Sequence, residues 1–386
     1  MSTPRPKATL CTVLTPAHVE LGALNLALTG QLNPATPYAW SIAFNPGVHT
    51  PPGAAADPPS GTGAASGDVE AFRQRFPEAA VRMGPSLERV SKAVMEDPAH
   101  RNVAKPERRR LLAKYLGSYH HAAGLAVALA GVKTRYAVVI DPDFYVVRPG
   151  WIAEITGHMQ GQDLAVFGAP WSPRWRQKYR GFPSTHLMAI DLEKIPAPAE
   201  LLKPDLLAGG RRVASPLWSR FAEAGGPGRL QAALAILRRP ARAIAEDLAQ
   251  RREIGGARDT GYGLMQDVRA RPELKTDLVQ AVFRREDGFL PGAVTPLQSH
   301  PLMEALLPEH LRYLPRRHVA ARGFAAFGYP DFRGRGWEEF LWRGEPFAVH
   351  VRGELQRRPG RGVDFEGLRG DLSAILARLG HAALRP

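Results

Sequence analysis

The sequence has a single cysteine, Cys11, among 386 residues, which excludes any disulfide within the chain. Its apolar neighbours in TLCTVL indicate a packed thiol rather than a nucleophile. No apolar run is long enough to span a bilayer, and the opening MSTPRPKATL lacks the apolar segment of a signal peptide. We therefore expect a cytoplasmic protein, whose contact with the inner face of the cell membrane is at most peripheral.

Acidic residues are fewer than basic ones. The chain has 37 Asp and Glu and 51 Lys and Arg, which give a formal net charge of +14. This excess favours contact with anions, which include nucleic acid, an anionic membrane surface and phosphorylated small molecules. The basic residues are spread over several segments without a recognisable nucleic-acid-binding motif. We therefore expect no nucleic-acid partner.

Apolar runs alternate with helical patterns along much of the chain. Strands are expected at 8–15, 38–44, 135–140, 164–170, 186–192 and 347–351, and helices at 18–32, at 119–132 and over part of 69–115. Continuously apolar strands that alternate with helices indicate an α/β fold. The predicted architecture is a mainly parallel, Rossmann-like sheet with helices on both faces.

Two segments interrupt this alternation. Residues 49–68 are rich in Gly, Pro and Ala and predict a flexible surface loop. Residues 197–255 predict a helical, basic insertion, whose amphipathic part either packs on its own domain, the commoner arrangement, or lies on an anionic membrane. We expect one domain over 1–355, followed by a polar tail with a terminal helix over 356–386.

The segment YAVVIDPDFYVV places Asp141 and Asp143 directly after an apolar strand. In an open α/β sheet, ligands bind at the carboxyl ends of the strands, next to a topological switch point. Two residues apart in extended chain, these carboxylates project to the same side, so that one can hold a divalent cation while the other reaches a ribose. Because Asp-Pro is a strong turn former, a purely turn-forming role is the alternative.

The order of motifs resembles that of GT-A fold glycosyltransferases, particularly glycosyltransferase family 2. The motifs are Thr15-Pro16 after the first strand, HHAAGLAVAL, DPDFYVVRPGW and RDTGYGLM, within 8–195 and 257–353. The resemblance implies a metal-dependent transfer of a sugar from a nucleotide-sugar donor to a saccharide or lipid-linked acceptor. It also implies a role in the synthesis of cell-surface polysaccharides or glycans.

The resemblance gives Asp141 the contact with ribose or metal and Asp143 the role of metal ligand. His350 matches a late histidine that completes the metal site in several such enzymes, and its imidazole suits Mn²⁺ somewhat better than Mg²⁺. Asp259 matches the general base of inverting enzymes, although Arg258 replaces the acid that usually precedes it. A helix N-cap is the alternative role of Asp259.

Further contacts are implied for the nucleotide sugar and the acceptor. Nucleotide-sugar contacts are assigned to Thr15, Pro16, Glu20, Asn45 and Arg352, and acceptor contacts to Trp171, Lys178, Tyr179 and His186. Asn45 is a departure, because the family usually has a base-contacting Asp there. For the acceptor residues, an exposed basic loop and a structural histidine are the alternatives.

Two other functions stay open. A sugar-phosphate nucleotidyltransferase shares a related sheet, but it would normally carry a Gly-rich basic loop after the first strand, where this chain has TPAHVELGAL. The net charge of +14 also suits a non-catalytic protein that binds polyanions or an anionic membrane.

Overall fold

The structure is a computed structural model. It describes residues 5–46, 62–101, 103–171, 181–205, 259–282, 314, 316–332, 337–351 and 364–384. The predicted contact residues Lys178, Tyr179 and Arg352 lie outside the described residues, as do residues 206–255 of the predicted basic insertion.

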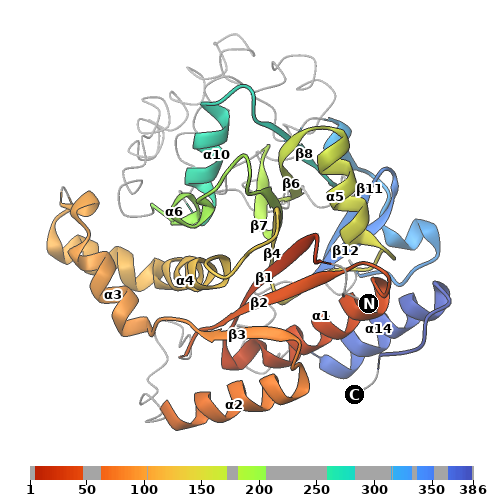
Figure 1. The fold of residues 1–386 in the computed structure, drawn as a ribbon, viewed down its shortest axis with the longest axis horizontal. Coiled ribbons are helices and arrows are strands. Elements are labelled where there is room, and N and C mark those ends of the chain that lie inside the picture. The colour runs from red at the N-terminus through yellow and green to blue at the C-terminus, as the bar shows by residue number, and fades with distance from the viewer. Residues whose placement is uncertain are drawn as a thin grey trace, which may run out of the picture.

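A sheet of seven described strands lies at the centre of the molecule, in the order β3-β2-β1-β4-β7-β6-β8 (Figure 1). Its strands are β1 (Ala8–Leu14), β2 (Tyr38–Phe44), β3 (Ala79–Met83), β4 (Tyr136–Ile140), β6 (Leu164–Pro170), β7 (Pro183–Asp191) and β8 (Lys275–Leu278). The strands from β3 to β4 run parallel, and β6 is parallel to β8. Only β7 is antiparallel to its neighbours, β4 and β6. The sheet is therefore mainly parallel, as predicted.

Helices cover both faces of this sheet. Since alternate residues of each strand point to opposite faces, each strand contributes side chains to both layers of core. One face carries α1 (Val19–Leu32), α2 (Thr62–Arg75), α5 (Trp151–Gly161) and α14 (Phe365–Arg378). The other carries α4 (Lys105–Leu129), α6 (Pro198–Leu202) and α10 (Tyr262–Arg269). Leu10 and Ile140 join the first core, whereas Cys11 and Val139 join the second. The predicted α/β fold class is confirmed.

The remaining described helices are short or peripheral. They are α3 (Leu87–Glu96), which packs on α4, and the 3-10 turns η1 (Pro16–His18), η2 (Pro98–His100), η6 (Arg316–His318) and η7 (Phe324–Phe327). Among the helices that the structure describes, none combines the length and the apolar character needed to cross a membrane.

Strand β1 lies at the switch point of the sheet. The chain adds β2 and then β3 on one side of β1, and returns to add β4 on the other side. The carboxyl ends of β1 and β4 therefore face a crevice where open α/β sheets bind ligands. Thr15 follows β1 and Asp141 follows β4 at this edge.

A second, mostly antiparallel sheet adjoins this edge, in the order β10-β9-β11-β12-β5. Its strands are β5 (Phe144–Val146), β9 (Gln280–Val282), β10 (Val319–Ala320), β11 (Glu338–Trp342) and β12 (Glu345–His350). Strand β5 begins directly after Asp143, and its pairing with β12 sets His350 opposite Phe144. This pairing brings the late histidine to the strand end that carries the two acids.

The predicted boundaries differ from the structure at two places. Helix α2 begins at Thr62, so the loop prediction for 49–68 is wrong over 62–68. The reason is that Val69 and Phe72 pack into the core at helical spacing and extend the helix into the Ala-rich segment before them. Within the predicted tail, α14 contributes Leu372 to the same core as α1, and Figure 1 shows the two helices side by side. The terminal helix is thus an integral part of the domain.

Candidate functional site

The segment from Asp141 to Phe144 forms a tight turn between β4 and β5. The N–H of Phe144 donates to the carbonyl of Asp141 at 3.1 Å, and the N–H of Asp141 donates to the carbonyl of His186 in β7 at 3.0 Å. The carbonyl of Asp143 accepts the N–H of Val351 at 2.9 Å. The turn-forming role of Asp-Pro is therefore real, and the turn holds both carboxylates at the strand end.

Polar side chains spaced one turn apart on and just after the mainly apolar helix α1, Asn25, Thr29 and Asn33, support this turn. The amide nitrogen of Asn25, which is buried, donates to the carbonyls of Phe144 at 2.9 Å and Asp141 at 3.3 Å. Thr29, one turn later, donates to the Asn25 side chain at 3.4 Å. Asn33, another turn on, accepts a backbone N–H at the start of α5 at 3.1 Å. These side chains together thus bind the whole segment from β4 to α5.

Histidines from separate elements surround the two acids. Nε2 of His121, on α4, lies 3.5 Å from Oδ1 of Asp141, and Nε2 of His186 lies 3.8 Å from its Oδ2. Nε2 of His350 lies 3.4 Å from Oδ1 of Asp143. The rings of His186 and His350 are 4.1 Å apart, centre to centre. The sequence pairing of Asp143 with His350 is therefore close in space, and His186 faces the same point.

The end of β1 adds a further histidine. Thr15 and Pro16 open η1, and Oγ1 of Thr15 is 3.2 Å from Nδ1 of His18 at its end. The charge of His18 acts to lower the pKa of both Asp143 and His121. Because β1 and β4 are parallel neighbours, the segment predicted to contact the nucleotide lies at the same edge of the sheet as the acids.

The pKa values of the two acids are shifted in opposite directions. Burial and the Asp143 carboxylate raise the pKa of Asp141 well above its ordinary value. Burial acts to raise the pKa of Asp143 too, but the charge and hydrogen bond of His350 lower it below its ordinary value. Burial alone would lower the pKa of His350, yet Asp143 and Glu338 raise it well above the ordinary value. Two carboxylates in one partly buried site favour the arrival of additional positive charge.

The donor atoms fit a divalent cation. Asp141, His186 and His350 each offer a ligand atom, and these three atoms lie within 4.8 Å of one another. Oδ1 of Asp141 and Nε2 of His121 are buried without a hydrogen bond in the described part of the chain, although they face each other. Burial, with His18, lowers the pKa of His121 to about 4, so its imidazole is neutral and able to bind a metal. Mixed carboxylate and imidazole donors suit Mn²⁺ and later transition metals better than Mg²⁺.

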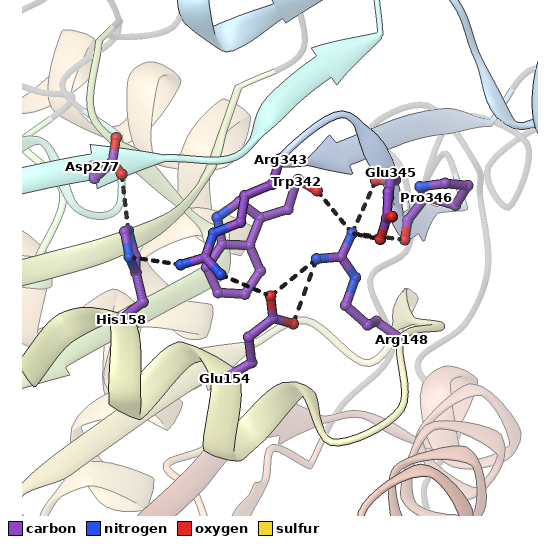
Figure 2. A network of polar contacts seen from close by, with 8 residues as sticks. All are labelled: Arg148, Glu154, His158, Asp277, Trp342, Arg343, Glu345 and Pro346. Atoms are coloured by element: carbon purple, nitrogen blue, oxygen red, sulfur yellow. Dashed lines mark hydrogen bonds and ion pairs between the residues drawn. The ribbon is translucent and has the colours of Figure 1, made fainter. Parts of the chain in front are cut away.

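A polar network clamps the β11–β12 hairpin to the chain that follows the acids (Figure 2). Arg148, between β5 and α5, donates to the carbonyls of Trp342 at 2.8 Å and Pro346 at 3.2 Å. Its other nitrogen lies 3.2 Å from Glu154 on α5. His350, at the end of the same hairpin, is thereby fixed relative to the turn that carries Asp143.

Two predicted nucleotide contacts have other partners in the structure. Asn45, at the end of β2, is buried and donates to the carbonyl of His120 at 2.7 Å. Its Oδ1 lies so close to Gly84 that a Cβ there would approach to 1.9 Å. Glu20 is exposed on α1 and lies 3.7 Å from Arg75 on α2. Asn45 thus joins β2 to α4, and Glu20 joins α1 to α2.

Asp259 is the first described residue after the gap at 206–258 and is buried. Its carboxylate accepts the N–H of Thr260 at 2.8 Å, and α10 begins at Tyr262 after Gly261, so Asp259 is not the N-cap residue. The hydroxyl of Thr260 donates to the carbonyl of Ser118 on α4 at 3.3 Å. Ser118 is one turn before His121, so the chain at Asp259 reaches α4 close to the metal-binding candidates.

Trp171 lies beside the acids on the side of β7. It is buried, and its ring meets that of His186 edge-on at 4.4 Å. The two described residues of the predicted acceptor set are therefore neighbours.

Sequence reasoning missed His18, His121 and Glu338. His18 belongs to no motif, and His121 lies within HHAAGLAVAL without a role assigned to it; both come near the acids only through the packing of η1 and α4. Glu338 carries no sequence signal either, because its hairpin partner is visible only in the structure, where Arg343 and Gly344, both with positive φ (53° and 78°), form the turn between β11 and β12. A register shift between Phe340 and Leu341 then sets Glu338 directly opposite His350.

The sequence matches no protein-family model and no curated protein. Several solved structures share features of the fold. Mouse xyloside xylosyltransferase 1 is 11% identical over 75% of this chain and 94% of its own, with a TM-score of 0.34. A mannosyltransferase from Pyrobaculum calidifontis, solved with GDP-Man and Mn²⁺, is 11% identical over 70% of this chain and 78% of its own, with a TM-score of 0.32. Both of these remote neighbours are glycosyltransferases.

Proposed function

We propose that the protein is a metal-dependent glycosyltransferase that moves a sugar from a nucleotide-sugar donor to a saccharide or lipid-linked acceptor. One observation carries the proposal: Asp141 and Asp143 stand at the carboxyl end of β4, at the switch point of the sheet, with His350 3.4 Å from Asp143. Partly buried acids at this edge, with imidazoles beside them, suit a cation that a diphosphate can share.

Asp143 and His350 would hold the cation, together with His186 and one oxygen of Asp141. When bound, such a cation supplies Lewis-acid stabilisation of the negative charge on the departing nucleoside diphosphate. The other oxygen of Asp141 is then available to the ribose of the donor. Thr15 and Pro16, at the same edge of the sheet, would contact the nucleotide, and Arg352 would pair with the diphosphate.

The acceptor hydroxyl must lose its proton as it attacks the anomeric carbon, and we assign the role of the base that accepts this proton to Asp259. A carboxylate within hydrogen-bond reach contributes about 10²–10⁴-fold to such a step. Direct displacement by the acceptor inverts the configuration at that carbon. Trp171 and His186 would form a wall of the acceptor subsite, with Lys178 and Tyr179 on the segment that follows Trp171. Replacing Asp259 by Asn should lower the turnover number by about 10²–10⁴-fold.

The cellular setting follows from the same chemistry. An enzyme that uses nucleotide sugars and saccharide or lipid-linked acceptors fits the synthesis of cell-surface polysaccharides or glycans. A net charge of +14 suits phosphorylated donors and peripheral contact with the anionic inner face of the cell membrane.

A thermal-shift screen tests the donor and the metal together. UDP, GDP, CMP and dTDP sugars would each be added to the protein with Mn²⁺, with Mg²⁺ or with EDTA. A ligand that binds only the native state stabilises it by a free energy of RT ln(1 + [L]/Kd). The melting temperature rises as a result. We expect one nucleotide class to raise it with Mn²⁺ and much less with EDTA, and Asp143→Asn to lose that effect. Stabilisation by polynucleotides alone would instead favour a polyanion-binding protein.

A further inference from the structure

Glu338 is a buried acid directly beside the proposed metal ligand His350. Its side chain is only 3% exposed, and Oε2 lies 3.0 Å from Nδ1 of His350 on the neighbouring strand. The antiparallel register of β11 and β12 sets the two residues opposite each other. Burial of a carboxylate costs free energy unless the group is paired and hydrogen-bonded. The buried position of Glu338 therefore depends on its contact with His350.

The contact fixes which nitrogen of His350 faces the crevice. Because Nδ1 points at the Glu338 carboxylate, Nδ1 carries a proton and donates it in a hydrogen bond. Nε2, on the opposite side of the ring, then points to Asp143 at 3.4 Å. Nε2 is thereby the nitrogen that faces the acids and would bind a metal.

We propose that Glu338 is a positioning residue for the cation: it holds His350 in the tautomer and ring orientation that bind metal through Nε2, and makes that nitrogen a stronger donor. This inference rests on the proposed function. Outer carboxylates of this kind typically change metal affinity by about 10–100-fold when they are replaced.

Its neighbour Glu339 provides a matched control. Glu339 is on the same strand and also buried, but it faces the other side of the sheet, where Oε2 accepts the N–H of Phe324 at 3.0 Å. Its replacement disturbs strand β11 to a similar degree without touching His350. A purely structural role for Glu338 would make the two substitutions equivalent.

The test compares Glu338→Gln with Glu339→Gln in the full-length chain. Glutamine keeps the size of the side chain and an oxygen that accepts the Nδ1 proton, but it removes the negative charge. The dissociation constant of Mn²⁺ would be measured by electron paramagnetic resonance and by calorimetry, without a nucleotide sugar. We expect Glu338→Gln to bind Mn²⁺ about 10–100-fold more weakly than wild type, and Glu339→Gln within about twofold of it.

The outcomes separate the inference from the function on which it rests. If wild type binds Mn²⁺ and Glu338→Gln binds it equally well, the inference is overturned while the proposed function stands. Equal weakening by Glu338→Gln and Glu339→Gln also overturns it. Failure of the wild type to bind Mn²⁺ counts against the proposed function itself. Should Glu338→Gln not fold, Glu338→Asp withdraws the carboxylate by one methylene and should still weaken binding more than Glu339→Asp.

Discussion

Replacing Asn25 by alanine should loosen the turn that carries both acids. The Asn25 amide bonds the carbonyls of Phe144 at 2.9 Å and Asp141 at 3.3 Å from within a buried part of α1. A buried group that loses its partner costs about 1–3 kcal/mol, and the longer of the two bonds adds less than the shorter. Alanine returns about 0.5 kcal/mol through its better helix propensity. We therefore expect a net loss of about 1–3 kcal/mol.

The assay combines denaturation with metal binding. Urea unfolding gives the free energy, and Mn²⁺ titration should show weaker binding because the carboxylates are no longer held in one geometry. The control is Gln31→Ala, which removes an exposed amide-to-carbonyl bond from the same helix to Ala382 at 2.7 Å. We expect little effect there, because solvent replaces the lost partner. If Asn25→Ala matched Gln31→Ala in both stability and Mn²⁺ affinity, the supporting role of Asn25 would be refuted.

Two other predictions concern the pairing of β6 with β7 and the burial of Cys11. A Cβ at Gly168 would lie 2.0 Å from the carbonyl oxygen of Leu187, so Gly168→Ala should push β6 from β7 and destabilise the protein by about 1–3 kcal/mol in urea unfolding; an unchanged midpoint would show that the strands adjust freely. Burial raises the pKa of the Cys11 thiol to about 12, so a disulfide-exchange reagent at pH 8 should leave native protein unmodified and label one thiol per chain in denaturant. Rapid labelling of the native protein would contradict the buried position of Cys11.

The central sheet was predictable because its strands leave a strong pattern. The segments at 8–15 and 38–44 are continuously apolar, and the structure buries β1 throughout since helices cover both faces. The helix before β4 was predicted over 119–132, with 69–115 helical only in part, and the structure joins the basic cluster at 105–115 to it in one helix, α4, which begins at Lys105. Strand β11 was missed because its two acids, Glu338 and Glu339, suggest an exposed segment although both are buried.

The site was only partly predictable. The positions of Asp141 and Asp143 follow from a strand pattern, and the resemblance to GT-A glycosyltransferases added His350 from more than 200 residues away. His121 could not be deduced in the same way, because no spacing along the chain relates a turn of α4 to the end of β4. Such contacts depend on how helices pack across a sheet, and hydrophobic patterns specify that packing only in outline.

The most direct test of the account is whether turnover of a nucleotide sugar requires a cation held by Asp143. The donor selected by thermal shift would be incubated with wild type and Asp143→Asn, with Mn²⁺ or with EDTA, and release of the nucleoside diphosphate would be measured. We predict release by wild type with Mn²⁺, near-complete loss in EDTA and in Asp143→Asn, and an unchanged circular dichroism spectrum of the variant. Equal turnover by Asp143→Asn, or turnover by wild type that EDTA leaves unaffected, would contradict the account.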